Sequence, residues 1–159
     1  MKGRGLVLFA LVSAALISLG SVAFAADNNI GTWKLNVAKS TYSPGPAPQS
    51  QTVKIEAWGE DGVKFTSDGV GPDGKPTHME FQAKYDGKDN PFKGNPDADT
   101  IAYKRTDANT IEAVTKLKGK VTINARAVVS NDGKTRTLTQ TGQDAQGRAV
   151  KTVAVYDKQ

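Results

Sequence analysis

Alternation with a period of two constrains this chain more than any other feature of its sequence. Short runs rich in Val, Ile, Thr and aromatic residues recur, and each is followed by a turn rich in Gly, Asp, Asn and Pro. This spacing is typical of a meander of β-hairpins. Asp73-Gly74 and Asp132-Gly133 are strong hairpin dipeptides, because glycine accepts the positive φ that such turns demand. The runs predict strands at about 31–35, 50–58, 62–69, 76–85, 99–106, 110–118, 120–130, 134–142 and 148–157.

Two of these runs have one apolar face. In the run at 76–85, one face carries Met79, Phe81, Ala83 and Tyr85. In the run at 120–130, one face carries Val121, Ile123, Ala125, Ala127 and Val129, and the other face carries Thr122, Asn124, Arg126 and Val128. An antiparallel sheet with one apolar face folds over a core. Consecutive strands without a crossover helix close most simply into an all-β, up-and-down antiparallel barrel of about eight to nine strands, which also removes exposed edges. A β-sandwich is the alternative, because the same pattern serves both.

Two stretches interrupt the meander. Residues 36–49 contain three prolines at alternate positions, which prevent a helix or a central strand and predict a semi-rigid extended loop. Residues 86–97 contain Pro91, Gly94 and Pro96 and predict a long loop at one rim of the barrel.

The first 25 residues resemble a cleavable secretory signal. Lys2 and Arg4 precede an apolar stretch at 6–19, and Ala23-Phe24-Ala25 is an A-x-A cleavage site, so we expect a single mature domain at 26–159. A transmembrane anchor is the rival, but the apolar run is short and no cluster of charges follows it. The chain has no cysteine, which excludes disulfides, thiolate metal sites and a lipid-modified cysteine. We therefore expect a periplasmic or secreted protein without a membrane anchor.

The sequence offers little for catalysis, metals or nucleic acids. The one histidine, His78, has no ligand partners at a recognised spacing and no nucleophile motif, so we expect an exposed strand residue, no enzyme activity and no cofactor. Asp86, Asp89, Asp97 and Asp99 lack the pattern of a calcium loop and are read as turn residues. Removal of the signal lowers the formal net charge from +5 to +3, and the basic residues are spread along the chain. This distribution indicates solubility and not a nucleic-acid surface.

Both ends of the expected domain resemble the calycin superfamily, which includes the lipocalins and fatty-acid-binding proteins. Residues 31–35, Gly-Thr-Trp-Lys-Leu, resemble the G-x-W at the start of the first strand in those families. Residues 126–158 resemble the last three strands of fatty-acid-binding proteins in order and spacing. The chain is also similar to uncharacterised exported bacterial proteins that begin G-T-W-K-L and end V-Y-[DE]-K. The resemblance implies a barrel with Trp33 packed across its closed end as a structural residue.

The same resemblance implies a candidate ligand site. Arg126 matches the first arginine of the carboxylate site in fatty-acid-binding proteins, and Tyr156 matches its tyrosine, whereas Ala154 stands where the second arginine would be. If the polar face of that strand points inward, Arg126 needs an anion, because an unpaired buried charge is strongly unfavourable. If the Val/Ile face points inward, Arg126 lies on the surface. Trp58, at the end of a strand, is either a rim aromatic for a ligand or a packing residue.

Two functions of different kinds follow. The first is an exported module that binds a small apolar or amphipathic molecule, because small barrels either fill with side chains or leave room for one ligand. The alternative is a ligand-free structural or stress-related periplasmic protein with a packed barrel. The threonines at alternate positions of the run at 134–142 favour interior space, and they are Thr135, Thr137, Thr139 and Thr141. The sequence leaves the ligand and the oligomeric state open.

Overall fold

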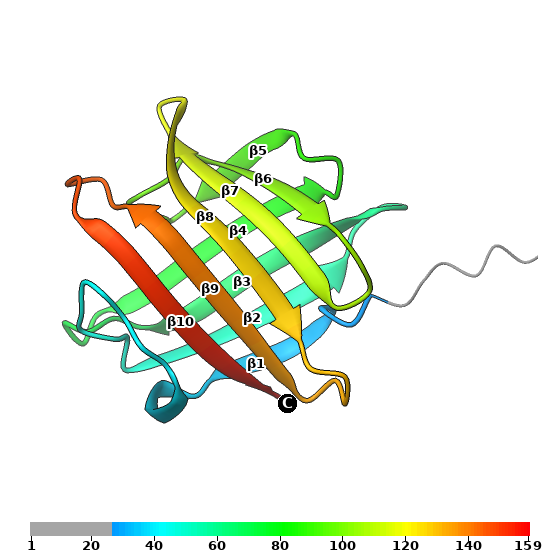
Figure 1. The fold of residues 1–159 in the computed structure, drawn as a ribbon, viewed down its shortest axis with the longest axis horizontal. Coiled ribbons are helices and arrows are strands. Elements are labelled where there is room, and N and C mark those ends of the chain that lie inside the picture. Colours follow the sequence, from blue (N-terminus) through cyan, green and yellow to red (C-terminus); the bar gives the residue numbers. More distant parts are fainter. Residues whose placement is uncertain (1–26) are drawn as a thin grey trace, which may run out of the picture.

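A computed structural model describes residues 27–159 (Figure 1). The predicted signal peptide at 1–25 lies outside this range, and cleavage after Ala25 stays a prediction. No helix between Asp27 and Gln159 is long and apolar enough to span a membrane.

The described chain folds into one closed antiparallel barrel of ten strands. Each strand pairs with its neighbours in sequence, and β1 closes the ring against β10, as the adjacent blue and red ribbons in Figure 1 show. The predicted all-β up-and-down barrel is confirmed, and the sandwich alternative is not adopted. The strands are β1 (Gly31–Leu35), β2 (Ser50–Ala57), β3 (Gly62–Val70), β4 (Pro76–Lys84), β5 (Asp89–Lys93), β6 (Thr100–Arg105), β7 (Thr110–Leu117), β8 (Lys120–Val129), β9 (Thr135–Gln143) and β10 (Ala149–Lys158).

The extra strand, β5, lies where the sequence predicted a long loop. Phe92 packs edge-on against Phe81 of β4, with 5.3 Å between the ring centroids. The amide of Phe92 donates to the carbonyl of Asp99 at 2.9 Å, so the nitrogen of Pro91 faces the other side, toward β4. The β4–β5 ladder comprises only the pairs Glu80–Lys93 and Phe81–Phe92, so Pro91 interrupts no hydrogen bond there. Aromatic packing therefore outweighs the turn-like composition of this segment.

A β-bulge changes the predicted faces of β8. The register with β7 shifts between Thr115 and Lys116, so that Thr122 is an extra residue on β8. Thr122 consequently turns inward, where its hydroxyl lies 2.9 Å from that of Thr115. Val121, predicted to share the apolar face, is 47% exposed. The remaining members of that face, from Ile123 onward, point into the barrel, which decides between the two orientations that the sequence left open.

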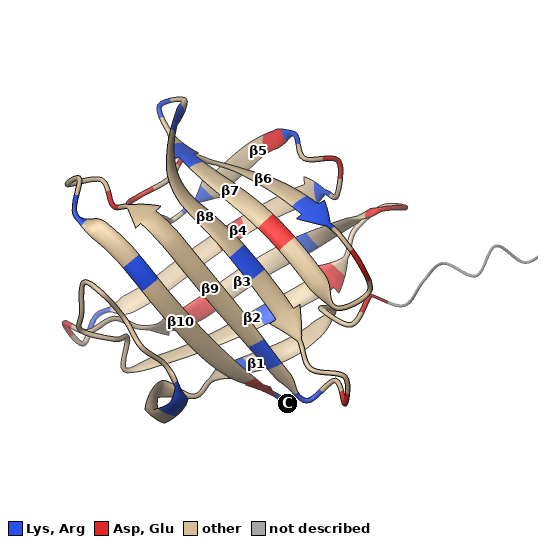
Figure 2. Ribbon diagram, in the orientation of Figure 1, with Lys and Arg blue, Asp and Glu red and all other residues tan. Residues whose placement is uncertain are grey.

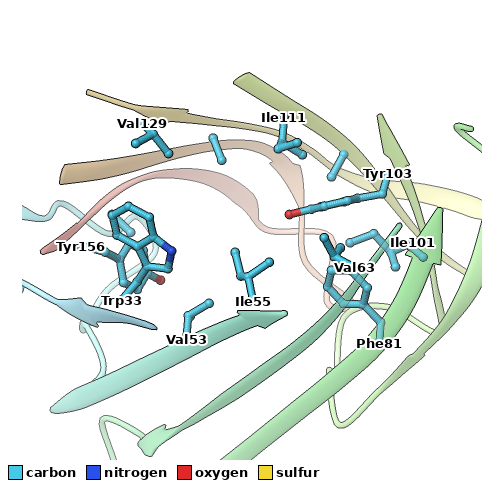
Figure 3. Packing of buried hydrophobic residues seen from close by; sticks show 14 of the residues in the cluster. Trp33, Val53, Ile55, Val63, Phe81, Ile101, Tyr103, Ile111, Val129 and Tyr156 are labelled. Carbon is cyan, nitrogen blue, oxygen red and sulfur yellow. The ribbon is translucent and has the colours of Figure 1, made fainter. Parts of the chain in front are cut away.

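The two ends of the barrel differ in what covers them. One end holds the β2–β3, β4–β5, β6–β7 and β8–β9 turns together with residues 27–30. The main-chain amide of Asn28 donates to the carbonyl of Ala108 at 3.0 Å, and the Trp33 indole donates to the carbonyl of Asn29 at 2.8 Å. Trp33 is fully buried there, on the side of the core that Figure 3 shows beside Tyr156. We call this the closed end.

The loop of residues 36–49 crosses the other end. It begins with a short 3₁₀ helix at Val37–Lys39 and then pairs with β10 through Thr41 and Ser43. This loop and the β3–β4 and β9–β10 turns lie toward the left in Figure 1. The loop is extended beyond the 3₁₀ helix, as the prolines predicted, and it borders a cavity in the barrel interior.

Candidate functional site

An interior cavity of about 480 Å³ opens at the end of the barrel opposite Trp33. Small residues and polar side chains of β9 and β10 leave this half of the interior unfilled, whereas Val63, Ile111 and Val129 fill the closed end. The side chains that line the cavity include Tyr42, Gln51, Phe65, Phe81, Phe92, Tyr103, Ala125, Arg136, Leu138, Gln140, Thr152, Ala154 and Tyr156.

One wall of the cavity is aromatic. Phe65 of β3 stacks on Phe81 of β4 with 4.6 Å between the ring centroids. Tyr103 of β6 meets Phe81 edge-to-face at 5.2 Å, and Phe92 meets it from the other side. Such offset and edge-to-face pairs are the preferred arrangements of aromatic rings. Strands β3 to β6 therefore present a rigid apolar surface to the cavity.

The wall formed by β2, β9 and β10 is polar. The Tyr156 hydroxyl donates to Gln51 Oε1 at 2.6 Å, which joins β10 to β2 across the β1 position. Gln140 and Thr152, directly paired on β9 and β10, also line the cavity. The cavity is thus amphipathic in cross-section, with rings on one side and hydrogen-bonding groups on the other.

Arg136 is the charged group of the polar wall. It is 3% exposed, and its Nε has no hydrogen-bond partner among the described residues. Its guanidinium carbon lies 6.0 Å from the centroid of the Tyr156 ring. The other three arginines within residues 27–159 each pair with carboxylates, which belong to Asp27, Asp61, Glu112 and Asp144. Arg136 has no such ion pair, so a buried positive charge faces the cavity without an anion.

The tyrosines around Arg136 respond to both burial and charge. Burial raises the pKa of Tyr156 and of Tyr103, and the nearby Arg136 guanidinium opposes that rise in both. Burial also raises the pKa of Tyr42, and Tyr156 adds to the rise. All three hydroxyls therefore stay protonated near neutral pH, and the hydrogen of Tyr156 is already donated to Gln51.

Arg126 does not reach this cavity. Its side chain is 57% exposed on the outer face of β8 and pairs with Glu112 at 3.3 Å. The Val/Ile face of β8 points inward instead, which is the arrangement under which Arg126 is a surface residue. The predicted anchor role is therefore corrected: this cation is solvated and already paired.

The other predicted site residues divide between the two ends. Tyr156, 3% exposed, lines the cavity beside Arg136, and its contact with a ligand stays a prediction. Trp58 lies in the β2–β3 turn at the closed end, is 39% exposed and does not line the cavity. The structure thus brings one of the three predicted ligand residues to the cavity.

Sequence reasoning missed Arg136 because β9 is polar on both faces. The threonines predicted to border interior space do not line the cavity, whereas the residues between them do, which are Arg136, Leu138 and Gln140. Leu138 was the available signal: it is the one large apolar residue of β9, and Arg136, two positions earlier, must share its face.

His78 lies outside the cavity, whereas two acidic residues, Asp97 and Asp144, are among its lining residues. His78 is on the outer face of β4, where its Nδ1 lies 2.6 Å from Asp68 Oδ1 and its Nε2 lies 3.8 Å from Glu80 Oε2. Within residues 27–159 no group of three or more His, Asp or Glu side chains is arranged to hold a metal ion. Figure 2 shows acidic and basic residues interspersed over the strands.

Comparison with known proteins gives a single kind of likeness. No protein-family model matches the sequence, and no curated protein matches it. Among solved structures, the fold is similar to that of the zebrafish ileal bile acid-binding protein complexed with cholic acid. The TM-score is 0.48 at 14% sequence identity, over 83% of this chain and 99% of that chain.

Proposed function

We propose that this protein binds one small amphipathic or apolar molecule inside its barrel. The cavity of about 480 Å³ carries the proposal, because its volume falls within the roughly 300–1,000 Å³ typical of small-molecule sites. A packed barrel, the rival function, would have no need of such a space. We place the protein among binding modules and not among enzymes.

The two walls define what kind of molecule fits. Phe65, Phe81 and Phe92 offer apolar surface to a hydrocarbon or ring system. The opposite wall offers the Gln51–Tyr156 pair and Gln140 to polar groups of the same molecule. A ligand that has one apolar and one polar side satisfies both walls at once.

The proposal includes export and a calycin-like origin. The basic, apolar and A-x-A order of the first 25 residues supports a protein that acts in the periplasm or outside the cell. The G-x-W start and the order of the last strands support descent from a calycin barrel. N-terminal sequencing of the mature protein should begin Ala26-Asp27-Asn28, and an intact Met1 in a membrane fraction would contradict export.

A neutral fluorescent probe tests binding in the cavity. N-Phenyl-1-naphthylamine is apolar, aromatic and bright only when removed from water. We expect it to bind the wild-type protein at one molecule per chain. Ala125→Trp, which places a large ring on the cavity face of β8, should abolish binding because the ring occupies the ligand's space.

Val128→Trp is the matched control, because it adds the same ring to the outer face of the same strand, where Val128 is 38% exposed. It should bind the probe as the wild type does. Absence of stoichiometric binding by the wild type, or equal binding by Ala125→Trp, would overturn the proposed function. If the wild type binds the probe and Ala125→Trp does not, a native mass spectrum of protein taken from its own cells would identify the natural ligand by its mass.

A further inference from the structure

We propose that Arg136 is an anion-binding anchor and that the cavity selects an amphipathic organic acid, whose acidic group pairs with this guanidinium. The inference rests on the proposed ligand-binding function and narrows its ligand class. The observation behind it is a guanidinium that is 3% exposed, lines the cavity and forms no ion pair within residues 27–159.

A buried charge without a counterion is costly, because desolvation removes the water that stabilised it. The surroundings of Arg136 compensate only in part. The Tyr156 ring, whose centroid is 6.0 Å from the guanidinium carbon, offers a π-face, and the hydroxyl oxygen of Tyr103 is a neutral acceptor. The Nε hydrogen remains without an acceptor. An acidic ligand group supplies both the missing acceptor and the missing negative charge.

The other arginines form ion pairs with carboxylates, unlike Arg136. Arg105 at the closed end pairs with Asp27 and Asp61, and Arg148 at the mouth pairs with Asp144. Each of the other three arginines within residues 27–159 therefore has a carboxylate partner. The absence of one at the most buried arginine points to a partner that arrives from outside the chain.

The position of Arg136 also orients the ligand. In the sheet register Arg136 stands opposite Val129 of β8 and Tyr156 of β10, both of which are buried. Gln140 lies four residues further along the same face, toward the mouth, where Pro44 and Pro96 border the opening. The acid group therefore enters first, and the apolar body extends along the aromatic wall toward the mouth.

A matched pair of probes tests this charge selectivity. 8-Anilinonaphthalene-1-sulfonate has the ring system of N-phenyl-1-naphthylamine plus one negative charge, so their affinity ratio isolates the contribution of the anion. The wild type should bind the sulfonate more tightly. Arg136→Met, which keeps an unbranched side chain and removes the charge, should lower sulfonate affinity about 10- to 100-fold, the loss expected for a hydrogen bond to a charged group. Its affinity for the neutral probe should change much less, so that the ratio of the two affinities falls.

Two further variants separate charge from packing. Arg136→Lys keeps the charge and should keep a preference for the sulfonate, at reduced strength because the planar fork is lost. Arg126→Met removes a cation from the outer face of β8 and should leave both affinities as in the wild type.

Each outcome decides the matter. Equal wild-type affinity for the two probes, or a sulfonate preference that persists in Arg136→Met, would overturn the anchor while leaving a ligand-binding cavity. Failure of the wild type to bind either probe would remove the proposed function itself. Because the wild-type ratio is informative alone, the test stands even if a variant folds poorly.

Discussion

The closed end and the open end of this barrel are built from the same ten strands but differ in how the interior is packed and how buried charges are paired. At the closed end Trp33, Val63 and Val129 fill the interior, and the charged groups of Asp27 and Arg105 satisfy each other. The rest of the interior contains a cavity that opens at the other end, and at its inner end, opposite Val129, the buried charge of Arg136 has no ion-pair partner. The difference teaches that packing and the proposed recognition are spatially separated: one end is filled by side chains, and the cavity leaves interior volume and a buried charge without an ion pair.

The chain before β1 makes the closed end possible. Asp27 accepts a hydrogen bond from the Tyr85 hydroxyl and lies 3.5 Å from Arg105, while Arg105 stacks over the Tyr85 ring at 4.8 Å from its centroid. The side chain of Asn28 donates to Asn109 at 2.6 Å. Residues 27–30 thus tie β1 to the β4–β5 and β6–β7 turns, which seals this end against water.

The largest expected effect is at the closed end. Trp33→Ala should lower the free energy of unfolding by ~3–5 kcal/mol, because the fully buried ring leaves a cavity and the indole hydrogen bond to Asn29 is lost. Denaturant titration measures this loss. A change below ~1 kcal/mol, the scale of surface substitutions, would contradict a packing role for Trp33.

A smaller effect is expected where the chain start is tied down. Asp27→Asn keeps the shape of the side chain but removes the charge that faces Arg105, and it should cost about 1–3 kcal/mol of unfolding free energy. Thermal or denaturant unfolding provides the measurement.

Asp61→Asn is the matched control, because Asp61 pairs with the same arginine but is 63% exposed. It should cost no more than ~1 kcal/mol, as is usual for exposed ion pairs. Equal losses in the two variants would show that the buried position of Asp27 gives it no special role.

Substitution of Arg136 in the cavity should not lower the free energy of unfolding, in contrast to the substitutions at the closed end. Replacement of Arg136 by Met in the ligand-free protein should leave the free energy of unfolding unchanged or raise it by up to about 2 kcal/mol, because it removes an unpaired buried charge. Denaturant titration without ligand tests this. A loss of stability comparable to that of Trp33→Ala would mean that Arg136 supports the fold and would erase the contrast between the two ends.

The fold was predictable because its determinants are local. The face of β4 that carries Phe81 and Ala83 is buried as its alternation predicted, and the Gly-containing turns fall where hairpins require them. The strand at 89–93 was not predictable, because its identity depends on Phe92 meeting Phe81 across the sheet. The bulge at Thr122 was equally hidden, since it arises from a register shift with β7.

The candidate site was predicted only in part. Tyr156 was found through its likeness to a known pattern, and it does line the cavity. Arg126 was proposed because the same likeness pointed to it, on the condition that the polar face of its strand points inward; Arg136 matched no known pattern and was not considered. An absent ion pair is a property of three-dimensional surroundings, so the significance of Arg136 appears only in the structure.

The smallest expected effect concerns the outer surface beside the open end, where charges are paired in water. The hydrogen bond to Asp68 raises the pKa of His78 above its usual 6.5, with smaller contributions from Glu80. A histidine whose folded pKa is raised contributes stability that is fully present below its unfolded pKa and is lost as the pH rises through the folded value. Both partners are more than half exposed, so this contribution should be small and should weaken further with salt.

NMR titration measures it directly, because the chain has one histidine. Asp68→Asn should move the midpoint down toward 6.5, since it removes the negative charge 2.6 Å from Nδ1. Glu80→Gln should move it less, because Glu80 lies 3.8 Å from Nε2 and also pairs with Lys93. Equal shifts in the two variants would contradict this ranking. Because His78 lies outside the barrel wall, neither variant should change probe binding in the cavity, which separates the solvated charges of the outer face from the buried charge of Arg136.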